Sequence, residues 1–234
     1  MFFKTTRVAA SRYAASARRV QCAIGWVAML SMLLALPLAA AAQGTARAAP
    51  APTRTVLVMG DSLSAAHGLA ASQGWVALTS ARIATTHPGW KLVNASISGE
   101  TTAGGASRIA GELRRHRPSV VVIELGANDG LRGLPLAQSR ANLERMIEAS
   151  TAAGARVLLI GMRMPPNLGR AYTEGFARNY AELAKADGLA FVPFLLEPIA
   201  LDRSAFQDDN LHPVAEAQPR LRDHVWPALK PLLD

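Results

Sequence analysis

Five continuous apolar runs, which recur at a nearly regular interval, constrain the fold of this chain more than any other feature of its sequence. Successive runs begin roughly 30 to 37 residues apart, close to the length of one strand followed by one helix. Each run is continuous rather than alternating, as in a parallel sheet that is buried on both faces. The runs are Val56–Met59, Leu92–Ala95, Val120–Leu125, Val157–Ile160 and Leu189–Phe194. They predict an α/β fold, a three-layer α/β/α sandwich with a five-stranded parallel sheet.

Helical patterns fill several of the intervals between the runs, and no second domain is indicated. Prolines and glycines mark where these patterns begin or stop, and a kink is expected at Pro219 or Pro227. The predicted helices run from Ala103 to His116, from Pro135 to about Ala153, through the stripe Tyr172, Phe176, Tyr180 and Leu183, and from about Pro213 to Leu233.

The first 42 residues have the composition of a targeting segment. Five basic residues and no acidic one precede an apolar run from Cys22 to Ala42, which ends in small residues. This order predicts a cleavable signal peptide over residues 1–42, a flexible linker over residues 43–53 and a folded domain over residues 54–234. A periplasmic or secreted protein is therefore expected. The alternative is an uncleaved inner-membrane anchor, because the apolar run approaches the ~20 residues that span a bilayer.

Much of the net charge of +8 belongs to the predicted signal peptide. Without it, 20 basic residues face 17 acidic ones, a balance that gives no reason to expect a nucleic-acid partner. Cys22 is the only cysteine, which excludes thiol catalysis and cysteine-based zinc sites in the predicted mature chain. A domain of this length can be stable on its core alone, and we expect a monomer.

Ser62 lies where chemistry is expected in such a sheet. It follows the first apolar run, and the carboxyl ends of parallel strands are where α/β proteins bind ligands. An activated serine needs a base, and histidine accepts a proton near neutral pH. His212 is the strongest candidate of the five histidines, because Asp209 lies three residues earlier and one tight turn would join carboxylate and imidazole. His67 is nearer to Ser62 in the sequence, but no acidic residue is set to orient it.

Simpler interpretations of these residues remain open at this point. Ser62 could merely cap the following helix. Asp208, Asp209 and His212 could form an ordinary polar loop, or could offer ligands to a metal ion, although no further His or Cys cluster would complete a cage.

Two later loops offer hydrogen-bond donors. Gly99 follows the second run, where its backbone N–H could turn toward the site, and Asn128 follows the third run with a side-chain amide. Such donors stabilise the oxyanion that forms during acyl transfer. Together with Ser62, they would stand at the carboxyl ends of three strands.

Four blocks of this sequence resemble the SGNH (GDSL) hydrolase family, in order and over nearly the whole predicted domain. The blocks are Gly60-Asp61-Ser62-Leu63, Gly99, Gly126-Ala127-Asn128-Asp129 and Asp209-Asn210-Leu211-His212. Within the family, the chain is most similar to the bacterial thioesterase I, lysophospholipase L1 and arylesterase group. The resemblance implies a catalytic triad of Ser62, His212 and Asp209. It also implies an oxyanion hole made by Ser62 N–H, Gly99 N–H and Asn128 Nδ2, with no metal or organic cofactor.

The chain departs from the family pattern at two positions near these blocks. Ala127 stands where relatives often have glycine, and His67 stands where an aromatic residue is common, which would alter the mouth of the pocket. The residues after the third and fourth runs would form an apolar groove for an acyl chain or would simply pack in the core. They are Leu131, Leu134, Met162, Met164, Pro165 and Pro166.

The expected function is therefore that of an exported serine esterase. It would hydrolyse acyl esters and thioesters, such as lysophospholipids and aryl esters, with acyl-CoA as a substrate in vitro, and would contact membrane surfaces transiently. Export would separate it from acyl-CoA, an intracellular metabolite. The alternatives are a carbohydrate deacetylase with a polar sugar cleft and a non-catalytic lipid-binding module.

Overall fold

Each of the five apolar runs forms a strand in the computed structural model, which describes residues 53–234. The strands are β1 (Arg54–Gly60), β2 (Trp90–Asn94), β3 (Val120–Glu124), β4 (Arg156–Ile160) and β5 (Ala190–Val192). All neighbours pair in parallel, in the order β2-β1-β3-β4-β5. The predicted five-stranded parallel sheet is confirmed. The predicted signal peptide and residues 43–52 of the predicted linker lie outside the described residues.

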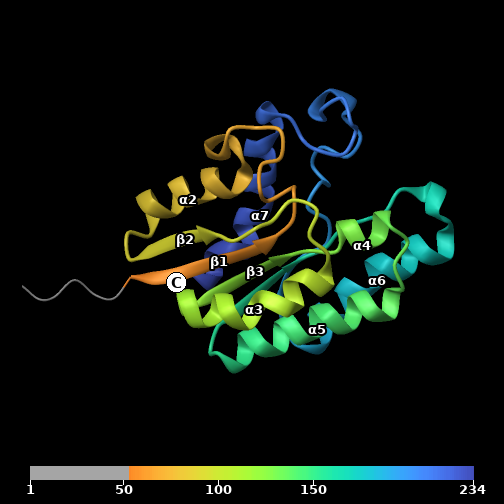
Figure 1. Cartoon of the computed structure of the whole chain (residues 1–234). Coiled ribbons are helices and arrows are strands. Elements are labelled where there is room, and N and C mark those ends of the chain that lie inside the picture. Colours follow the sequence, from red (N-terminus) through yellow and green to blue (C-terminus); the bar gives the residue numbers. More distant parts are fainter. Residues whose placement is uncertain (1–52) are drawn as a thin grey trace, which may run out of the picture. The chain divides into compact units, whose positions relative to one another are not determined.

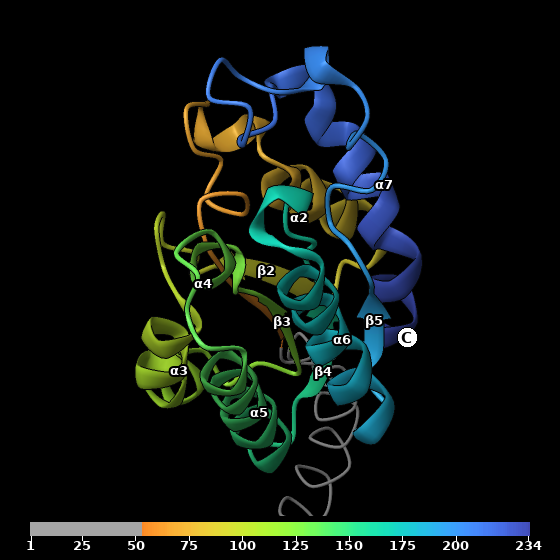
Figure 2. The same ribbon diagram turned by 90° about the vertical axis from the view of Figure 1, so that its right-hand side faces the viewer.

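Helices cover both faces of the sheet, which confirms the predicted three-layer sandwich (Figures 1 and 2). One face carries α2 (Trp75–Thr86) and α7 (Gln218–Leu229), and the other carries α3 (Thr102–His116), α5 (Leu136–Ala152) and α6 (Arg170–Ala186). A short helix, α4 (Ala127–Leu131), follows β3. Short 3₁₀ turns lie at Ala71–Gln73, Pro166–Leu168, Arg203–Ala205, Ala215–Ala217 and Lys230–Leu232.

The strand order places a crevice above the middle of the sheet. β1 is flanked by β2 on one side and β3 on the other, so the chain reverses its direction of travel across the sheet at β1. The connections that leave the carboxyl ends of β1 and β3 then run to opposite faces. In open α/β sheets this switch point is where ligands bind.

The core lies mainly on the three inner strands, β1, β3 and β4, and in β4 the residues Val157 to Ile160 are at most 5% exposed. Val56 to Met59 of β1 are fully buried, and the side chains of β3 are at most 2% exposed. Burying each large aliphatic side chain contributes about 1.5–3 kcal/mol. The edge strands β2 and β5 are only partly covered, and β5 is shorter as a strand than its apolar run in the sequence. The central strands therefore form a rigid base for the loops at their carboxyl ends.

The helix predictions agree with the structure for α3, α5 and α6 to within about two residues, the usual uncertainty of helix ends. The predicted start of the last helix is wrong. Pro213 pairs with Phe206 in an isolated antiparallel bridge, and α7 begins only at Gln218, with Pro219 in its first turn. Proline is tolerated there because its missing N–H would have no partner in the helix. Pro227 remains inside α7.

Helix α2 has no counterpart among the predicted helices. It begins after Gly74 without a side-chain cap, so it lacks the start signal by which a helix is recognised. Tertiary contacts hold it instead: the Trp75 N–H donates to Gln218 Oε1 at the start of α7, at 2.9 Å. Among residues 53–234, no helix combines the length and the apolar character that crossing a bilayer requires.

Candidate active site

Ser62 lies in a tight turn at the carboxyl end of β1. The preceding strand ends at Gly60, where a Cβ atom would lie 2.6 Å from the Ser64 Cβ, so a side chain would prevent the turn. Asp61 Oδ1 accepts the Leu63 N–H at 3.0 Å, and the Ser62 carbonyl accepts the His67 N–H at 3.1 Å. These bonds set the backbone around Ser62 and present its hydroxyl at the switch point of the sheet.

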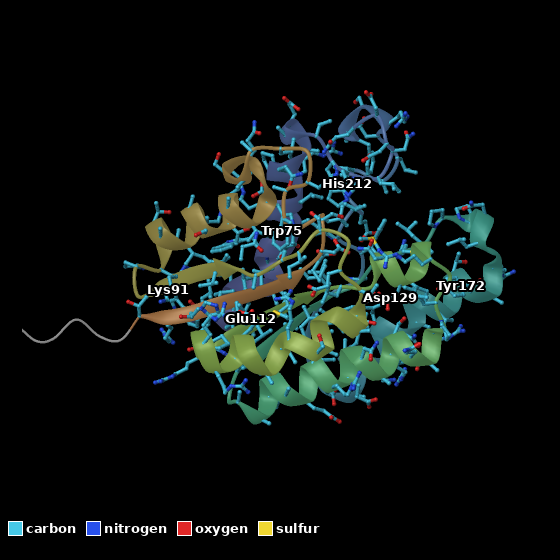
Figure 3. All side chains as sticks on the ribbon, viewed as in Figure 1. Trp75, Lys91, Glu112, Asp129, Tyr172 and His212 are labelled. Atoms are coloured by element: carbon cyan, nitrogen blue, oxygen red, sulfur yellow. The ribbon has the colours of Figure 1, made fainter. Side chains whose placement is uncertain are left out.

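His212 comes from the loop between β5 and α7, which passes over the same end of the sheet. Figure 3 shows His212 beyond the carboxyl ends of the strands, whereas Lys91 of β2 lies at the opposite end. His212 Nε2 is 2.8 Å from Ser62 Oγ, and His212 Nδ1 is 2.6 Å from Asp209 Oδ2. The structure thus brings the three predicted triad residues together across a separation of 150 residues.

The turn that joins Asp209 to His212 is built around the carboxylate. Asp209 Oδ1 accepts the backbone N–H groups of Leu211 at 2.9 Å and His212 at 3.0 Å, while Oδ2 faces the imidazole. Asn210 has a φ of +60°, a conformation that asparagine tolerates better than most residues. One carboxylate therefore orients both the backbone and the ring of His212.

The electrostatics of this pair suit a base at Nε2. The hydrogen bond with the His212 side chain, followed by the two backbone N–H bonds, holds the pKa of Asp209 well below its usual range. Asp209 is therefore anionic at neutral pH. A carboxylate at Nδ1 favours the tautomer that carries its proton there, which leaves the Nε2 lone pair facing the serine hydroxyl.

Gln207 anchors this loop, and sequence reasoning assigned it no role. Its backbone N–H donates to the His212 carbonyl at 2.8 Å. Its side-chain Nε2 donates to the carbonyls of His67 at 2.9 Å and Pro213 at 3.1 Å. The side chain thus ties the His212 loop to the segment that follows Ser62. Only its place just before Asp208 and Asp209 hinted at this.

The three predicted oxyanion donors line one cavity with Ser62 and His212. Gly99 has a φ of +79°, which glycine adopts readily. Within residues 53–234, neither the Gly99 N–H nor the Ser62 N–H has a hydrogen-bond acceptor. Asn128 Nδ2 lies 3.1 Å from the Glu100 carbonyl and 3.3 Å from Asp61 Oδ2. The backbone N–H groups of Ser62 and Gly99 are thus free to donate, and the Asn128 side-chain amide lines the same cavity.

Asp129 fixes the short helix that carries Asn128. Its buried carboxylate accepts the Thr102 N–H at 2.8 Å and the Thr102 hydroxyl at 2.5 Å at the start of α3, and the Ser139 hydroxyl at 3.1 Å on α5. Sequence reasoning included Asp129 in a family block without assigning it a contact. The bonds from α3 and α5 position Asn128 relative to the rest of the site.

Two buried carboxyl groups lie beneath the Ser62 turn, and sequence reasoning missed this arrangement. Asp61 is fully buried, and burial raises its pKa from 3.8 to about 6. Glu124, at the end of β3, is 2% exposed, and burial followed by the nearby Asp61 carboxylate raises its pKa well above the usual range. The Ser64 hydroxyl donates to Glu124 Oε2 at 2.6 Å. No sequence rule predicts two acidic side chains inside a core, because such burial is normally unfavourable.

The cavity beside Ser62 has a volume of about 590 Å³ and a mainly apolar lining. Leu131, Met162, Met164, Pro165 and Pro166 all line it, as predicted for an acyl groove. Leu134 is not among the lining residues. Its N–H donates to the Asp129 carbonyl at 3.0 Å and its carbonyl accepts the Tyr172 hydroxyl at 2.9 Å, so it closes a turn outside the cavity.

The remaining histidines have other positions. The His67 ring centroid is 4.4 Å from that of His212, so His67 forms part of the cavity mouth. His87 contacts Thr86 and Asp234, His116 pairs with Glu112, and His224 bonds the Phe194 carbonyl. In the part of the chain that the structure describes, no three His, Cys, Asp or Glu side chains are grouped so as to hold a metal ion.

Comparisons with known proteins place this geometry in a family context. Residues 58–218 match the model of the GDSL-like lipase/acylhydrolase family. The chain is 50% identical to an esterase, TesA, of Pseudomonas aeruginosa over 183 residues, which cover 78% of this chain and 91% of that protein. It is 40% identical to thioesterase 1/protease 1/lysophospholipase L1 of Escherichia coli over 194 residues, 81% of this chain and 89% of that protein. A crystal structure of TesA matches with a TM-score of 0.74 at 50% identity, covering 76% and 99% of the two chains.

Proposed function

This chain belongs to the GDSL-like lipase/acylhydrolase family, as its four sequence blocks indicated, and on that premise we propose that it is a serine esterase that acts through Ser62, His212 and Asp209. The observation that carries this proposal is the chain of contacts from Asp209 Oδ2 to His212 Nδ1, at 2.6 Å, and from His212 Nε2 to Ser62 Oγ, at 2.8 Å. A nucleophile, a base and an orienter within hydrogen-bond reach form the arrangement that activates a serine.

In the first half of the proposed reaction, Ser62 Oγ attacks the carbonyl carbon of the substrate while His212 Nε2 takes the hydroxyl proton. The carbonyl oxygen becomes an oxyanion, which accepts hydrogen bonds from Ser62 N–H and Gly99 N–H. Asn128 Nδ2 supplies a third by exchanging its longer contact, with Asp61 at 3.3 Å, for the oxyanion. The bond to the leaving oxygen or sulfur then breaks, and His212 returns the proton to the leaving group.

In the second half, water replaces the alcohol or thiol. His212 removes a proton from the water as its oxygen attacks the acyl-enzyme carbonyl, and the same donors hold the second oxyanion. The ester bond to Ser62 breaks, the acid leaves, and the serine hydroxyl regains its proton from His212. Every proton movement in this scheme uses side chains of the protein, water and the substrate.

We propose acyl esters and thioesters with an apolar acyl chain as substrates, namely lysophospholipids and aryl esters, with acyl-CoA hydrolysed in vitro. The apolar lining of the cavity supports this class, because Leu131, Met162, Met164, Pro165 and Pro166 would surround a hydrocarbon chain. The names of two relatives, an esterase and a thioesterase/lysophospholipase, support the same class. The carbohydrate deacetylase considered from the sequence would need a more polar cleft.

We also propose that the protein is exported, acts as a monomer and meets membrane surfaces only transiently. The proposed export rests on the signal-peptide pattern of residues 1–42, which lie outside the described residues, and the proposed monomer rests on a domain long enough to be stable on its core alone. Cell fractionation and the mass of the mature amino terminus test export. Light scattering of the purified protein tests the monomer. An intact amino terminus in the inner-membrane fraction would favour the anchored alternative.

Labelling with a p-nitrophenyl alkylphosphonate tests the site. We expect one equivalent to bind, with loss of esterase activity, and the modified peptide to carry the added mass on Ser62. Ser62→Ala should neither label nor hydrolyse p-nitrophenyl esters. Ser107→Ala is the matched control, because Ser107 is an exposed α3 residue whose hydroxyl bonds only the Gly104 carbonyl. Labelling of another residue, or hydrolysis retained in Ser62→Ala, would contradict the assignment.

A comparison of kcat/KM between substrates tests the proposed substrate class. We expect kcat/KM for p-nitrophenyl esters to rise as the acyl chain lengthens beyond acetate, and lysophospholipid to be hydrolysed. Met164→Ala should weaken this dependence on chain length, because Met164 is 8% exposed and lies against the cavity. A preference for acetylated xylan would instead favour the deacetylase, and activity on acyl-CoA alone would contradict an esterase that works outside the cytoplasm.

A further inference from the structure

Among residues 53–234, the lining of the active-site cavity contains one arginine and no acidic residue. Arg163 follows β4, and its neighbours in the lining are apolar, small or neutral polar residues and two histidines, His67 and His212. A cavity without a carboxylate offers no internal counter-ion to the guanidinium. An anionic group that enters the cavity would therefore meet a positive charge without first displacing a negative one.

Arg163 is held in place by its neighbours rather than by an ion pair. Met162 and Met164 on either side are buried, whereas the Arg163 side chain is exposed. Its Cζ atom lies 5.5 Å from the ring centroid of Phe194, which lines the same cavity. A guanidinium over an aromatic face keeps the N–H donors at its edge available to an oxyacid.

The other arginines close to the site already have partners. Arg108 pairs with Glu100, and Arg132 Nη2 donates to the Gly99 carbonyl at 3.1 Å. By contrast, Arg163 forms neither an ion pair nor a hydrogen bond with any residue between 53 and 234. Its donors are therefore free, and Arg163 belongs to the lining of the cavity in which a substrate of the proposed reaction would bind.

We propose that Arg163 is a specificity-determining residue that binds a phosphate group of the substrate, so that the enzyme prefers phosphate-bearing acyl esters or thioesters to neutral ones. This inference rests on the proposed esterase function and adds the charge preference of its site. A planar guanidinium matches the geometry of phosphate oxygens with two parallel N–H donors. Two sources share this chemistry: the head group of a lysophospholipid and the phosphates of an acyl-CoA.

Matched substrate pairs separate the preference for a phosphate group from the reactivity of the ester or thioester bond. One pair is 1-lauroyl-lysophosphatidylglycerol and monolauroylglycerol, which share the acyl glycerol ester and differ in the phosphate. The other is lauroyl-CoA and S-lauroyl-N-acetylcysteamine, which share the thioester. For each pair we measure the ratio of kcat/KM, phosphate-bearing over neutral, below the micellar concentration and at a single pH.

We expect Arg163→Gln to lower the ratio about three- to tenfold in at least one pair, mainly through KM, as for the loss of a charge-assisted contact near solvent. Arg163→Lys should retain part of the preference, and Arg163→Glu should lower the ratio further. Added salt should lower the wild-type ratio more than that of Arg163→Gln. Arg170→Gln is the control, because Arg170 is exposed on α6, pairs with Glu174 and does not line the cavity.

The outcome also identifies the source of the phosphate. A change confined to the glycerol esters assigns the contact to a lipid head group, a change confined to the thioesters assigns it to the phosphates of acyl-CoA, and a change in both assigns it to phosphate in general. Unchanged ratios in Arg163→Gln, with all four substrates still hydrolysed, would overturn the role of Arg163 and leave the esterase intact. Failure of the wild-type protein to hydrolyse any of them would overturn both proposals.

Discussion

Replacement of Asp61 by asparagine should make the stability of this protein less dependent on pH. Asp61 is fully buried beneath Ser62, and burial raises its pKa from 3.8 to about 6. Between these two values the folded protein binds a proton at Asp61 that the unfolded chain does not, so the contribution of Asp61 to stability is fully present below pH 3.8 and is lost as the pH rises through about 6. Asparagine has nearly the same shape and no charge to bury.

The magnitude follows from the shift of the pKa. A difference of about 2 units between folded and unfolded states corresponds to about 3 kcal/mol of stability lost above pH 6. Most of this loss, about 2–3 kcal/mol, falls between pH 4 and pH 8, because only part of the unfolded-state titration lies below pH 4. On going from pH 4 to pH 8, the free energy of unfolding of Asp61→Asn should therefore rise relative to that of the wild type by about 2–3 kcal/mol.

Urea unfolding of both proteins at pH 4 and pH 8 measures this difference. The new amide places a donor against Asn128 Nδ2, which lies 3.3 Å from Asp61 Oδ2, but that cost is independent of pH and cancels between the two conditions. Repeating the comparison in a Glu124→Gln background removes the neighbouring carboxyl, whose pKa responds to Asp61. A pH-dependent difference below about 1 kcal/mol, or one of opposite sign, would refute the idea that Asp61 ionises at a cost inside the fold.

Three further predictions follow from the site and from one helix end. Asp209→Asn should lower kcat for p-nitrophenyl esters by roughly 10³–10⁴-fold through loss of the carboxylate at His212 Nδ1, whereas the exposed Asp208→Asn should leave it near the wild-type value. Asn128→Ala should lower kcat about 10²–10³-fold with a smaller change in KM, and an unchanged kcat would remove Asn128 from the oxyanion hole. Arg117 has a φ of +42° at the end of α3, so thermal unfolding should show Arg117→Gly to be more stable than Arg117→Ala by about 1 kcal/mol. Equal stability of the two would show that this backbone is unstrained.

The elements that could be predicted are those whose signals lie within a short stretch of sequence. Each strand is a continuous apolar run, and α3, α5 and α6 show helical spacing with a recognisable end. The pairing of Asp209 with His212 could also be predicted, because a separation of three residues is enough for the turn that joins them. Helix α2 could not be predicted, because its first turn has no side-chain cap. It is held instead by Gln218, which is 143 residues further along the chain.

The contacts that support the site could not be predicted from the sequence, for a different reason. Gln207 bonds the His67 carbonyl across 140 residues, and a glutamine in a polar loop carries no sign of its partner. Asp61 and Glu124 break the rule that acidic side chains lie outside, so residue type alone does not predict that both carboxyl groups are buried together, even though Glu124 falls inside the apolar run Val120–Leu125. Leu134 was predicted to line the cavity because it comes after β3, but its carbonyl closes a turn and its side chain is not part of the lining.

The amino-acid sequence by itself determined the fold class, the strand positions and the serine, histidine and aspartate candidates, because backbone propensity and turn chemistry act between residues that are close along the chain. The tertiary structure alone decided that His212 Nε2 lies 2.8 Å from Ser62 Oγ and that two carboxyl groups are buried below. It also decided that Arg163 lines a cavity to which residues 53–234 contribute no acidic side chain. These features depend on the order of strands in the sheet and on which surfaces the helices cover, and both are set by burial over the whole domain.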